Sequence, residues 1–358
     1  MLKANHFLLD IPSYIPGKSK TNHQQVIKLS SNENALGASK KAIEVYKKHT
    51  DKLFRYPDGS CSDLTNCLAE INNINPKQIV CGAGSDEIIS LLTTAFASID
   101  DEVLYSEYGF LMYPISAKKV GAKPIKVLET NLKTNLDNFL NSISSKTKII
   151  FIANPNNPTG SYVSNQELET FLSKVPNNIL VVLDHAYQEF VTANNYYNGC
   201  DLVEKYQNLV ITRTFSKIYG LASLRIGWSY SSLYVAEMLH KVRGPFNVNG
   251  AGQFTAIASL QDVEFLQESV YHNSFWLEKF QQFFANLKTV VQYPSVANFV
   301  LVDFFSQQKA QEINEKLLEN GIIIRDMASY NLHSCLRISI GNNQENQYLL
   351  DVLQKILV

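Results

Sequence analysis

A lysine beside hydroxyl residues is the first group in this sequence that could do covalent chemistry. Lys217 follows Ser216 directly, and Thr214 lies just after the apolar run 208–211, which reads as a buried strand. Arg225 adds a fixed cation eight residues further on. An amine whose pKa is lowered by burial or by a nearby cation can form a Schiff base. The three side-chain types together suit a ligand with an aldehyde and a phosphate, although most lysines are solvated loop residues.

Four segments further upstream favour the same kind of ligand. Asp184 ends an apolar strand pattern, and the carboxyl ends of strands are where open α/β sheets bind ligands. Residues 154–160, Asn-Pro-Asn-Asn-Pro-Thr-Gly, follow another strand pattern and are too rigid and polar for a simple linker. Residues 82–87 join a strand to a helix pattern, which offers backbone N–H groups to phosphate. The aromatic segment 108–114 supplies a ring face.

The ordered motifs Asn-Pro-x-Gly, Asp-x-x-Tyr, Ser-Lys and Arg-x-Gly resemble those of the fold-type-I pyridoxal-phosphate aminotransferases. Within them the sequence is most similar to the histidinol-phosphate aminotransferase subfamily. The resemblance extends nearly from end to end and includes the segments 29–37, 55–59, 243–249 and 336–341. Departures from the usual pattern occur at Ala35, Ser106, His185 and Ser223. None of these positions is expected to contact the cofactor directly.

The resemblance implies pyridoxal 5'-phosphate as the cofactor and assigns its reactive contacts. Lys217 is expected to bind it covalently and later to move a proton, while Asp184 keeps the pyridine nitrogen protonated. Without Lys217, we would interpret Asp184 as a helix N-cap. Tyr187 and Asn157 are expected to bind the phenolic oxygen. Asn154 precedes a proline in the same way as Asn157, so the residues alone barely separate the two asparagines.

The remaining cofactor contacts concern the phosphate and the ring face. A helix N-terminus and an arginine suit a dianion. The expected phosphate ligands are Gly84, Ser85, Asp86, Ser216 and Arg225. A Rossmann nucleotide loop is the alternative for the Gly-x-Gly, but Glu87 stands where a third glycine is needed. Tyr108 is expected to stack on the ring, with core packing as its alternative.

Further residues are assigned by resemblance to the substrate and to a partner subunit. Tyr56 is expected to reach the phosphate across a homodimer interface, and an ordinary turn tyrosine is the alternative. Arg337 and Arg325, on neighbouring strand patterns, are the expected anion pair, because two arginine forks can bind a carboxylate or a phosphate. A structural ion pair is the alternative for each. Asn32 and Tyr14 complete the expected substrate contacts, although Tyr14 could equally anchor the N-terminal arm by packing.

Composition describes a soluble enzyme and excludes several function classes. The 358 residues carry a formal net charge of −1, which provides no basic field for nucleic acid and no polybasic patch for lipid. No apolar run approaches the ~20 residues needed to span a bilayer, and no signal peptide is recognisable. Five cysteines, an odd number without Cys-x-x-Cys spacing, and seven scattered histidines favour a reducing cytoplasm and argue against a metal site.

The pattern of elements predicts an α/β protein with two domains. Strand and helix patterns alternate from residue 78 onward, which indicates a mainly parallel, doubly wound sheet with helices on both faces. The strand 225–230 follows the lysine loop without a helix and is the predicted antiparallel member. A helical stripe over 262–289 is interpreted as the link between domains. The expected parts are an N-terminal arm (1–28), a large cofactor-binding domain (29–262) and a small α/β C-terminal domain (263–358).

The resemblance implies a cytoplasmic homodimeric enzyme of histidine biosynthesis. It would convert L-histidinol phosphate and 2-oxoglutarate to imidazole-acetol phosphate and L-glutamate, an amino donor and a 2-oxo acid, without nucleic acid or membrane partners. One alternative is an aminotransferase for phenylalanine or tyrosine. Another is a lyase similar to threonine-phosphate decarboxylase. A third is a catalytically silent cofactor-binding or regulatory protein, against which the intact lysine, aspartate, tyrosine and asparagine set argues.

Overall fold

A seven-stranded sheet forms the centre of the larger part of the protein. The computed structural model describes residues 2–11, 26–196 and 198–357, so Tyr14 lies outside the described residues. The strand order is β2-β8-β7-β6-β5-β3-β4. The bounds are β2 (Ile79–Gly82), β3 (Glu102–Ser106), β4 (Lys123–Val127), β5 (Thr147–Ala153), β6 (Leu180–Asp184), β7 (Leu209–Thr214) and β8 (Gly227–Ser231).

The sheet is parallel except for β8, as the sequence predicts. Strand β8 runs antiparallel to both of its neighbours, β2 and β7. The segment that joins β7 to β8 contains only the short 3-10 helix η5 (Ala222–Leu224), and a parallel pairing needs a longer crossover. The predicted α/β fold with a mainly parallel sheet is confirmed.

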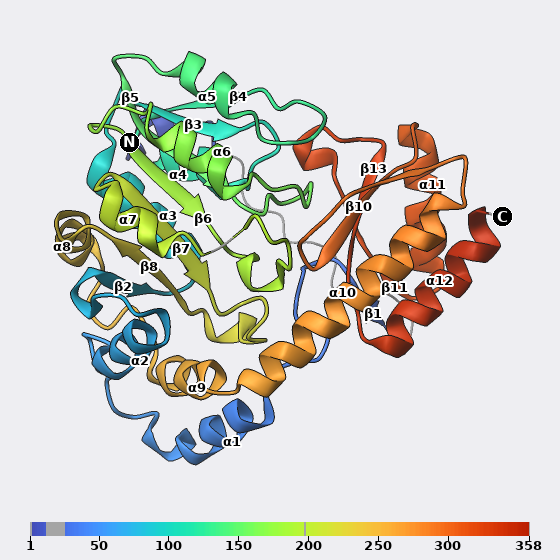
Figure 1. Ribbon diagram of the computed structural model, residues 1–358, viewed down its shortest axis with the longest axis horizontal. Helices are drawn as coiled ribbons and strands as arrows, with labels where there is room; N and C mark the ends of the chain where they lie inside the picture. The colour runs from blue at the N-terminus through green and yellow to red at the C-terminus, as the bar shows by residue number, and fades with distance from the viewer. Residues whose placement is uncertain (1, 12–25, 197, 358) are drawn as a thin grey trace.

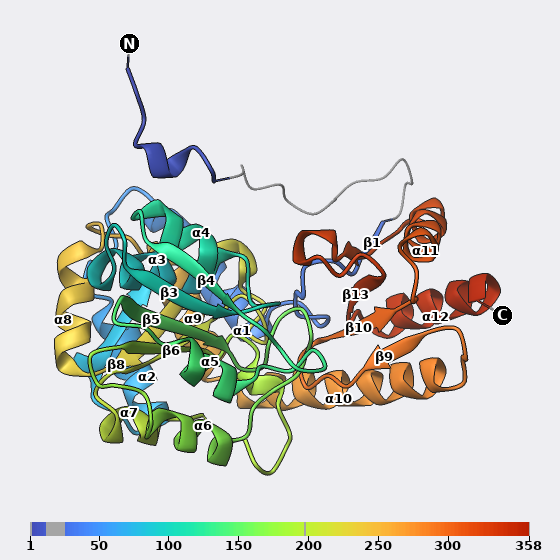
Figure 2. The same cartoon turned by 90° about the horizontal axis from the view of Figure 1, so that it is seen from above.

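Helices cover both faces of this sheet (Figures 1 and 2). One face packs against α3 (Ser85–Phe96), α4 (Met112–Lys119) and α8 (Leu233–Val242). The other packs against α2 (Ser62–Asn72), α5 (Leu136–Ser142), α6 (Asn165–Leu172), α7 (Cys200–Lys205) and α9 (Gly250–Leu260). Because successive strand residues point to opposite faces, Phe151 belongs to the first core and Ile150 and Ile152 to the second. The helix α1 (Lys40–Lys48) packs on α9.

The long helix α10 (Val263–Ala285) leads from α9 to a second, smaller group of elements (Figure 1). A four-stranded sheet of order β12-β13-β10-β9 lies there. Its bounds are β9 (Val291–Tyr293), β10 (Phe299–Asp303), β12 (Arg325–Asp326) and β13 (Cys335–Ser339), and its helices are α11 (Gln307–Glu319) and α12 (Asn343–Leu357). Trp276, Phe280 and Phe284 of α10 enter its core. The predicted boundary at 262/263 stays a prediction.

The shortest elements differ most from the sequence predictions. The segment 322–326 contains two separate strands, β11 (Ile322–Ile323) and β12, which pair with different strands. Strand β11 pairs in parallel with β1 (Ile27–Lys28), a two-residue strand that the sequence analysis missed together with β9 and α7. Two or three residues are too few to show a period, so hydrophobic patterning cannot identify such strands.

A small apolar cluster joins the two groups of elements. Leu301, Met327, Tyr330 and Cys335 of the smaller group are buried against Tyr108, Leu111 and Leu132 of the larger one. Tyr330 closes the 3-10 helix η6 (Ala328–Tyr330), which lies between β12 and β13. These contacts bring β13 and its arginine close to the carboxyl edge of the large sheet.

Candidate active site

A cavity of about 140 Å³ lies at the carboxyl ends of β5, β6 and β7. This edge is where parallel α/β sheets bind their ligands. The lining residues are Ser85, Asp86, Phe110, Tyr113, Ala153, Pro155, Asn157, Asp184, Ala186, Tyr187, Thr214, Ser216, Lys217 and Arg225. The structure therefore brings together eight of the residues predicted from sequence, although they are spread over 140 positions of the chain, from Ser85 to Arg225.

Lys217 reaches the cavity from the loop that follows β7. Its Nζ donates to the backbone oxygen of Ser31 at 3.1 Å and lies 5.5 Å from the ring centre of Tyr187. Burial, and next the cation of Arg337, lowers the pKa of Lys217 to about 8. Burial disfavours the charged ammonium, as does a nearby like charge. The lysine is thereby suited to act as a nucleophile or a base near neutral pH.

Asp184 is the last residue of β6 and is buried. Its Oδ2 accepts a hydrogen bond of 2.8 Å from the hydroxyl of Tyr113. Its Oδ1 is also buried and has no hydrogen-bond partner among the described residues. Burial raises the pKa of this carboxyl to about 6. The Thr212 hydroxyl and the Ala186 N–H act to lower the pKa of this carboxyl, and Oδ1, which has no partner at hydrogen-bond distance and angle, can accept an N–H group from a ligand.

Tyr113 is a site residue that the sequence analysis missed. It lies in the first turn of α4, fully buried, and its ring stacks on Phe151 with centroids 4.8 Å apart. Sequence gives no signal for its bond to Asp184, because the two residues are 71 positions apart and a buried tyrosine on an apolar helix face is ordinary core.

Asn157 and Tyr187 are each held by a residue from the smaller group or from the segment after β1. The amide oxygen of Asn157 accepts from Arg337 Nη1, and Arg337 Nη2 donates to the Ser30 carbonyl at 2.8 Å. The Tyr187 hydroxyl accepts from Asn32 Nδ2 at 3.0 Å. These bonds join the predicted cofactor ligands to two of the predicted substrate ligands.

The structure separates the two asparagines that the sequence could not. Asn154 uses its side chain to hold the loop closed: its Oδ1 accepts from the Val163 N–H at 2.9 Å and its Nδ2 donates to the Val163 oxygen at 3.1 Å. Asn157 lines the cavity, whereas Asn154 does not. The Asn157 assignment is thus the one that the geometry favours.

The predicted phosphate ligands surround the amino end of α3. Gly84 has a φ of +88°, and a Cβ there would lie 2.5 Å from Arg225 Nη2, so the position needs glycine. Arg225 donates to the Ser216 hydroxyl and to Asp86 Oδ2, both at 3.2 Å. Since α3 presents free N–H groups and the positive end of its dipole beside a guanidinium, this end of the cavity can hold an anion.

Arg325 and Arg337 are directly opposite each other in the antiparallel pair of β12 and β13. Facing residues of such a pair point to the same side of the sheet, so the two guanidinium groups share one face. Arg337 is buried, and Arg325 is half-buried. This register agrees with a pair of cations that bind one anion.

Two predicted residues lie away from this cavity. Tyr108 packs in the cluster that joins the two groups of elements, and Phe110 is the aromatic residue of the same loop that borders the cavity. Tyr56 is 83% exposed and stacks on Phe246, with ring centroids 4.7 Å apart. The role predicted for Tyr56 stays a prediction, whereas the packing of Tyr108 favours Phe110 of the same loop for the ring contact.

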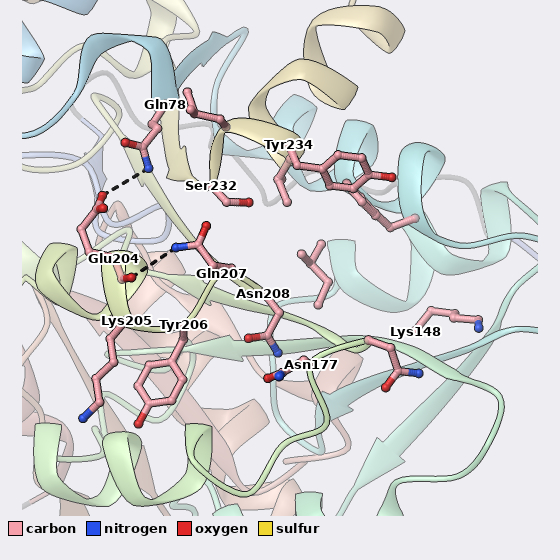
Figure 3. A pocket seen from close by; sticks show the side chains of 15 residues that line it. Gln78, Lys148, Asn177, Glu204, Lys205, Tyr206, Gln207, Asn208, Ser232 and Tyr234 are labelled. Atoms are coloured by element: carbon pink, nitrogen blue, oxygen red, sulfur yellow. Dashed lines mark hydrogen bonds between the residues drawn. The ribbon is translucent and has the colours of Figure 1, made fainter.

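A larger hollow of about 680 Å³ lies at the opposite, amino edge of the sheet (Figure 3). Its amide side chains bond within the hollow: Gln78 Nε2 donates to the Glu204 carboxylate at 3.2 Å, and Gln207 Nε2 donates to the Glu204 backbone oxygen at 3.2 Å. Its described residues include no counterpart of Lys217, with its lowered pKa, together with a carboxylate like that of Asp184. Chemistry, and not volume, identifies the smaller cavity as the candidate active site.

Searches for two other kinds of site found nothing in the described part of the chain. Over residues 2–11, 26–196 and 198–357, no group of three or more histidine, cysteine, aspartate or glutamate side chains could hold a metal ion. No helix within the same ranges is long and apolar enough to cross a membrane.

Comparisons with known proteins agree with this geometry. The histidinol-phosphate aminotransferase of Rhodospirillum centenum is 42% identical over 351 residues, 98% of this chain and 97% of the relative. That of Paramagnetospirillum magneticum is 42% identical over 353 residues, 98% of this chain and 97% of the relative. The crystal structure of histidinol-phosphate aminotransferase from Sinorhizobium meliloti in complex with pyridoxal-5'-phosphate superposes with a TM-score of 0.86 at 26% identity, covering 92% of this chain and 91% of that one.

The predicted family is thereby confirmed. Residues 24–353 match the family described as aminotransferase class I and II, and this range contains the whole cavity. The chain belongs to the class I and II aminotransferases.

Proposed function

We propose that the protein is a pyridoxal-phosphate-dependent aminotransferase of histidine biosynthesis. It transfers the amino group of L-histidinol phosphate to 2-oxoglutarate and yields imidazole-acetol phosphate and L-glutamate. The observation that carries the proposal is a low-pKa Lys217 and a strand-end Asp184 in one cavity with an anion site at its far end. The names of relatives that are 42% identical over almost the whole chain support the substrate.

The residues of the cavity fit pyridoxal phosphate group by group. The unpartnered Oδ1 of Asp184 suits a protonated pyridine nitrogen, and the amine of Lys217 suits an aldehyde carbon. The cradle at Gly84, with Arg225 and Ser216, suits the phosphate. Each polar end of the cofactor therefore has a matching side chain in this chain.

The aromatic residue against the ring is proposed to be Phe110. It borders the cavity, whereas Tyr108, two residues earlier, packs toward Leu301 and Met327. A phenylalanine offers a flat apolar face without a hydroxyl that would need a partner. Tyr108 then helps to hold the loop rather than to bind the ring.

The chain's own residues supply acid–base chemistry and positioning. When bound, the cofactor supplies an electron sink for the carbanion formed at the amino acid's α-carbon. Lys217, with a pKa of about 8, would accept the proton of the amino acid's α-carbon at Nζ and return it two atoms further along, a 1,3-shift. Asp184 keeps a proton at the pyridine nitrogen, which maintains the electron demand of the ring. Tyr187 and the NH2 group of Asn157 hold the phenolic oxygen in its anionic form.

Arg337 and Arg325 are proposed to bind the anionic groups of both substrates. They lie opposite each other on β13 and β12, and a guanidinium fork binds a carboxylate or a phosphate in a bidentate manner. The 2-oxo acid has two carboxylates and histidinol phosphate has one phosphate. A pair of arginines can serve each in turn, as a two-substrate exchange through one site requires.

A cytoplasmic homodimer completes the proposal. Tyr56 is exposed on a surface with Leu53, Phe54 and Phe246, which are 70%, 75% and 45% exposed. A cluster of exposed aromatic and aliphatic side chains is typical of a protein interface. A second copy of the chain is proposed to cover it, with Tyr56 reaching the phosphate end of the partner's cavity. All five cysteines are free, which suits a reducing compartment.

Product analysis tests the proposed reaction. The purified protein is incubated with histidinol phosphate, tyrosine, phenylalanine or threonine phosphate, each with and without 2-oxoglutarate. We expect glutamate from histidinol phosphate when the 2-oxo acid is present, and no carbon dioxide from threonine phosphate. Glutamate from tyrosine and phenylalanine alone would replace the proposed substrate by aromatic amino acids. Release of carbon dioxide would indicate a lyase.

A further inference from the structure

Glu129, a carboxylate outside the cavity, joins two of the loops that form it. It follows β4, and its Oε1 accepts three hydrogen bonds: from the Ser106 hydroxyl at 2.6 Å, from the Tyr108 backbone N–H at 3.3 Å and from Asn156 Nδ2 at 3.2 Å. Ser106 and Asn156 are each 1% exposed. No step of the proposed reaction uses this carboxylate.

The three donors lie next in sequence to residues of the cavity. Asn156 directly precedes Asn157, whose side chain lines the cavity and accepts from Arg337. Tyr108 precedes by two residues Phe110, which also lines the cavity. Because only a few backbone dihedrals separate these donors from the neighbouring residues, an anchor at the donors restricts where the neighbouring side chains can lie.

The surroundings of Glu129 are unfavourable for a residue that served folding alone. Its Oε2 is buried and has no hydrogen-bond partner among the described residues. A second carboxylate adjoins it, since Glu107 Oε2 accepts from the Glu129 backbone N–H at 3.3 Å. Burial raises the pKa of the Glu129 carboxyl to about 7, and Glu107 adds to the rise. Unfavourable polar arrangements of this kind are typical of functional sites.

Above its pKa of about 7 this carboxyl is ionised, and an ionised oxygen that accepts three donors is well suited to fix loops. Hydrogen bonds to an ionised acceptor are roughly twice as strong as neutral ones. A neutral hydroxyl or amide at the same place would hold these three donors, which belong to two chain segments, more weakly. The desolvation free energy of the buried carboxylate is thus offset by the hydrogen bonds that hold the two loops in place.

We propose that Glu129 is a positioning residue for the cofactor, holding the loops 107–111 and 154–160 in one geometry so that Phe110 and Asn157 border the cavity at fixed places. This inference rests on the proposed function, because it assumes that the cavity binds pyridoxal phosphate. It assigns Glu129 no contact with the cofactor or the substrate. Its action passes through Asn156 to Asn157 and through Tyr108 to Phe110.

The test compares Glu129→Ala and Glu129→Gln in the cofactor-loaded protein. The readouts are the dissociation constant of pyridoxal phosphate and the pH midpoint of its visible absorption, which follows the bond from Asn157 to the phenolic oxygen. For Glu129→Ala, loss of one bond to a charged oxygen should weaken cofactor binding about tenfold and raise the midpoint by about one unit. Glu129→Gln keeps a neutral acceptor oxygen, so it should restore part of the lost binding and part of the shift in the midpoint.

Glu102→Gln is the matched control. Glu102 lies at the opposite end of β3, where its carboxylate accepts from the Ser144 hydroxyl far from the cavity edge, so both readouts should equal those of the wild type. If Glu129→Ala does not fold, Asn156→Ala cuts the same contact from the other side and should raise the midpoint in the same way.

The outcomes separate this inference from the proposed function. A wild type that shows no visible absorption with pyridoxal phosphate would overturn the proposed function itself. A wild type that binds the cofactor, together with a Glu129→Ala or Asn156→Ala variant whose midpoint is unchanged, would overturn the positioning role alone. A shifted midpoint with restoration by glutamine supports it, because a merely structural residue would lower stability without moving the midpoint.

Discussion

The hydroxyl of Tyr113 donates a hydrogen bond of 2.8 Å to Asp184 Oδ2, fully buried beneath the candidate active site. This bond occupies one oxygen of the carboxylate, and the other, Oδ1, has no partner among the described residues, although Asp184 lines the cavity. Tyr113 therefore fixes which oxygen of Asp184 is offered to a ligand, and it opposes the effect of burial on the pKa of that carboxyl.

Tyr113→Phe should lower kcat, while the cofactor should still bind. The change removes one hydrogen bond to a charged group, about 1.5–3 kcal/mol, and leaves the stacking on Phe151 intact. We expect kcat to fall about tenfold or more and the pKa of Asp184 to rise further in the cofactor-free protein. Steady-state kinetics and a pH titration of cofactor binding measure both.

Tyr162→Phe is the control for that change. The Tyr162 hydroxyl donates to Asn195 at 2.9 Å, and neither residue lines the candidate active site. Its kinetics should match the wild type. Equal kinetics for Tyr113→Phe and the wild type would show that the bond to Asp184 has no catalytic consequence.

Lys217→Ala should abolish turnover and still permit weak, non-covalent cofactor binding. Lys217 supplies the only amine that lines the cavity within the described residues. Borohydride reduction of the wild type, followed by peptide mapping, should place the cofactor on the peptide that contains Lys217. A reduced adduct on any other lysine would refute this assignment.

Mixed subunits test whether each site is built from two chains. Lys217→Ala and Tyr56→Phe proteins are each expected to be impaired. In a heterodimer of the two, one site carries both changes and the other carries neither, so activity should exceed that of both parents. Proven subunit exchange without a gain in activity would place Tyr56 within its own chain's surface or outside the site altogether.

Arg325 should discriminate between substrates more than it supports catalysis. Arg337 is buried and already bonded to Asn157 and Ser30. Arg325 is half-buried and lies on β12, the edge strand of the four-stranded sheet. Losing one charged hydrogen bond costs about 1.5–3 kcal/mol, so Arg325→Gln should lose about ten- to a hundredfold in kcat/KM on histidinol phosphate. The loss on tyrosine or phenylalanine should be much smaller. An equal loss on all three substrates would make Arg325 a general anion-binding or structural residue.

Glu129→Gln should change the pH dependence of stability. Burial raises the pKa of this carboxyl from 4.5 to about 7, so the folded protein holds a proton that the unfolded chain releases between these values. This contribution to wild-type stability is complete below pH 4.5 and is lost as the pH rises through 7.

Glutamine does not titrate, so the variant lacks this loss. Relative to wild type, its free energy of unfolding should rise between pH 5 and pH 8 by up to about 3 kcal/mol. Urea unfolding at both pH values measures the change, with Glu102→Gln as the control. A difference between variant and wild type that is the same at pH 5 and pH 8 would contradict the raised pKa.

The sequence could predict the residues that stand at strand ends. Asp184 ends one apolar strand and Lys217 lies in the loop after another, and parallel strands bring their carboxyl ends to one edge of the sheet, so two local patterns were enough to place them in one cavity. The large sheet and its single antiparallel strand followed from the same alternation of patterns.

Contacts between distant side chains were beyond such reasoning. Glu129 meets Ser106 and Asn156 from 23 and 27 positions away, and nothing in its own neighbourhood marks it as a buried acceptor. The choice between Asn154 and Asn157 likewise depends on which side chain turns back to Val163. Local periodicity carries no information on the direction of a single side chain, so these contacts could be seen only in the folded structure.

The pairing of β1 with β11 attaches the segment that follows β1 to the smaller group of elements. Through β1 the chain first joins that group, and the Leu29 oxygen accepts from Ser339 N–H before the chain crosses to the large sheet. It returns through α10 (Figure 2). Among the described residues, the segment after β1 and helix α10 are therefore the two connections between the groups, and a rotation of the smaller group would bend both. The segment after β1 contains Ser31 and Asn32, which bond Lys217 and Tyr187. A rotation of the smaller group would therefore change these two contacts in the candidate active site.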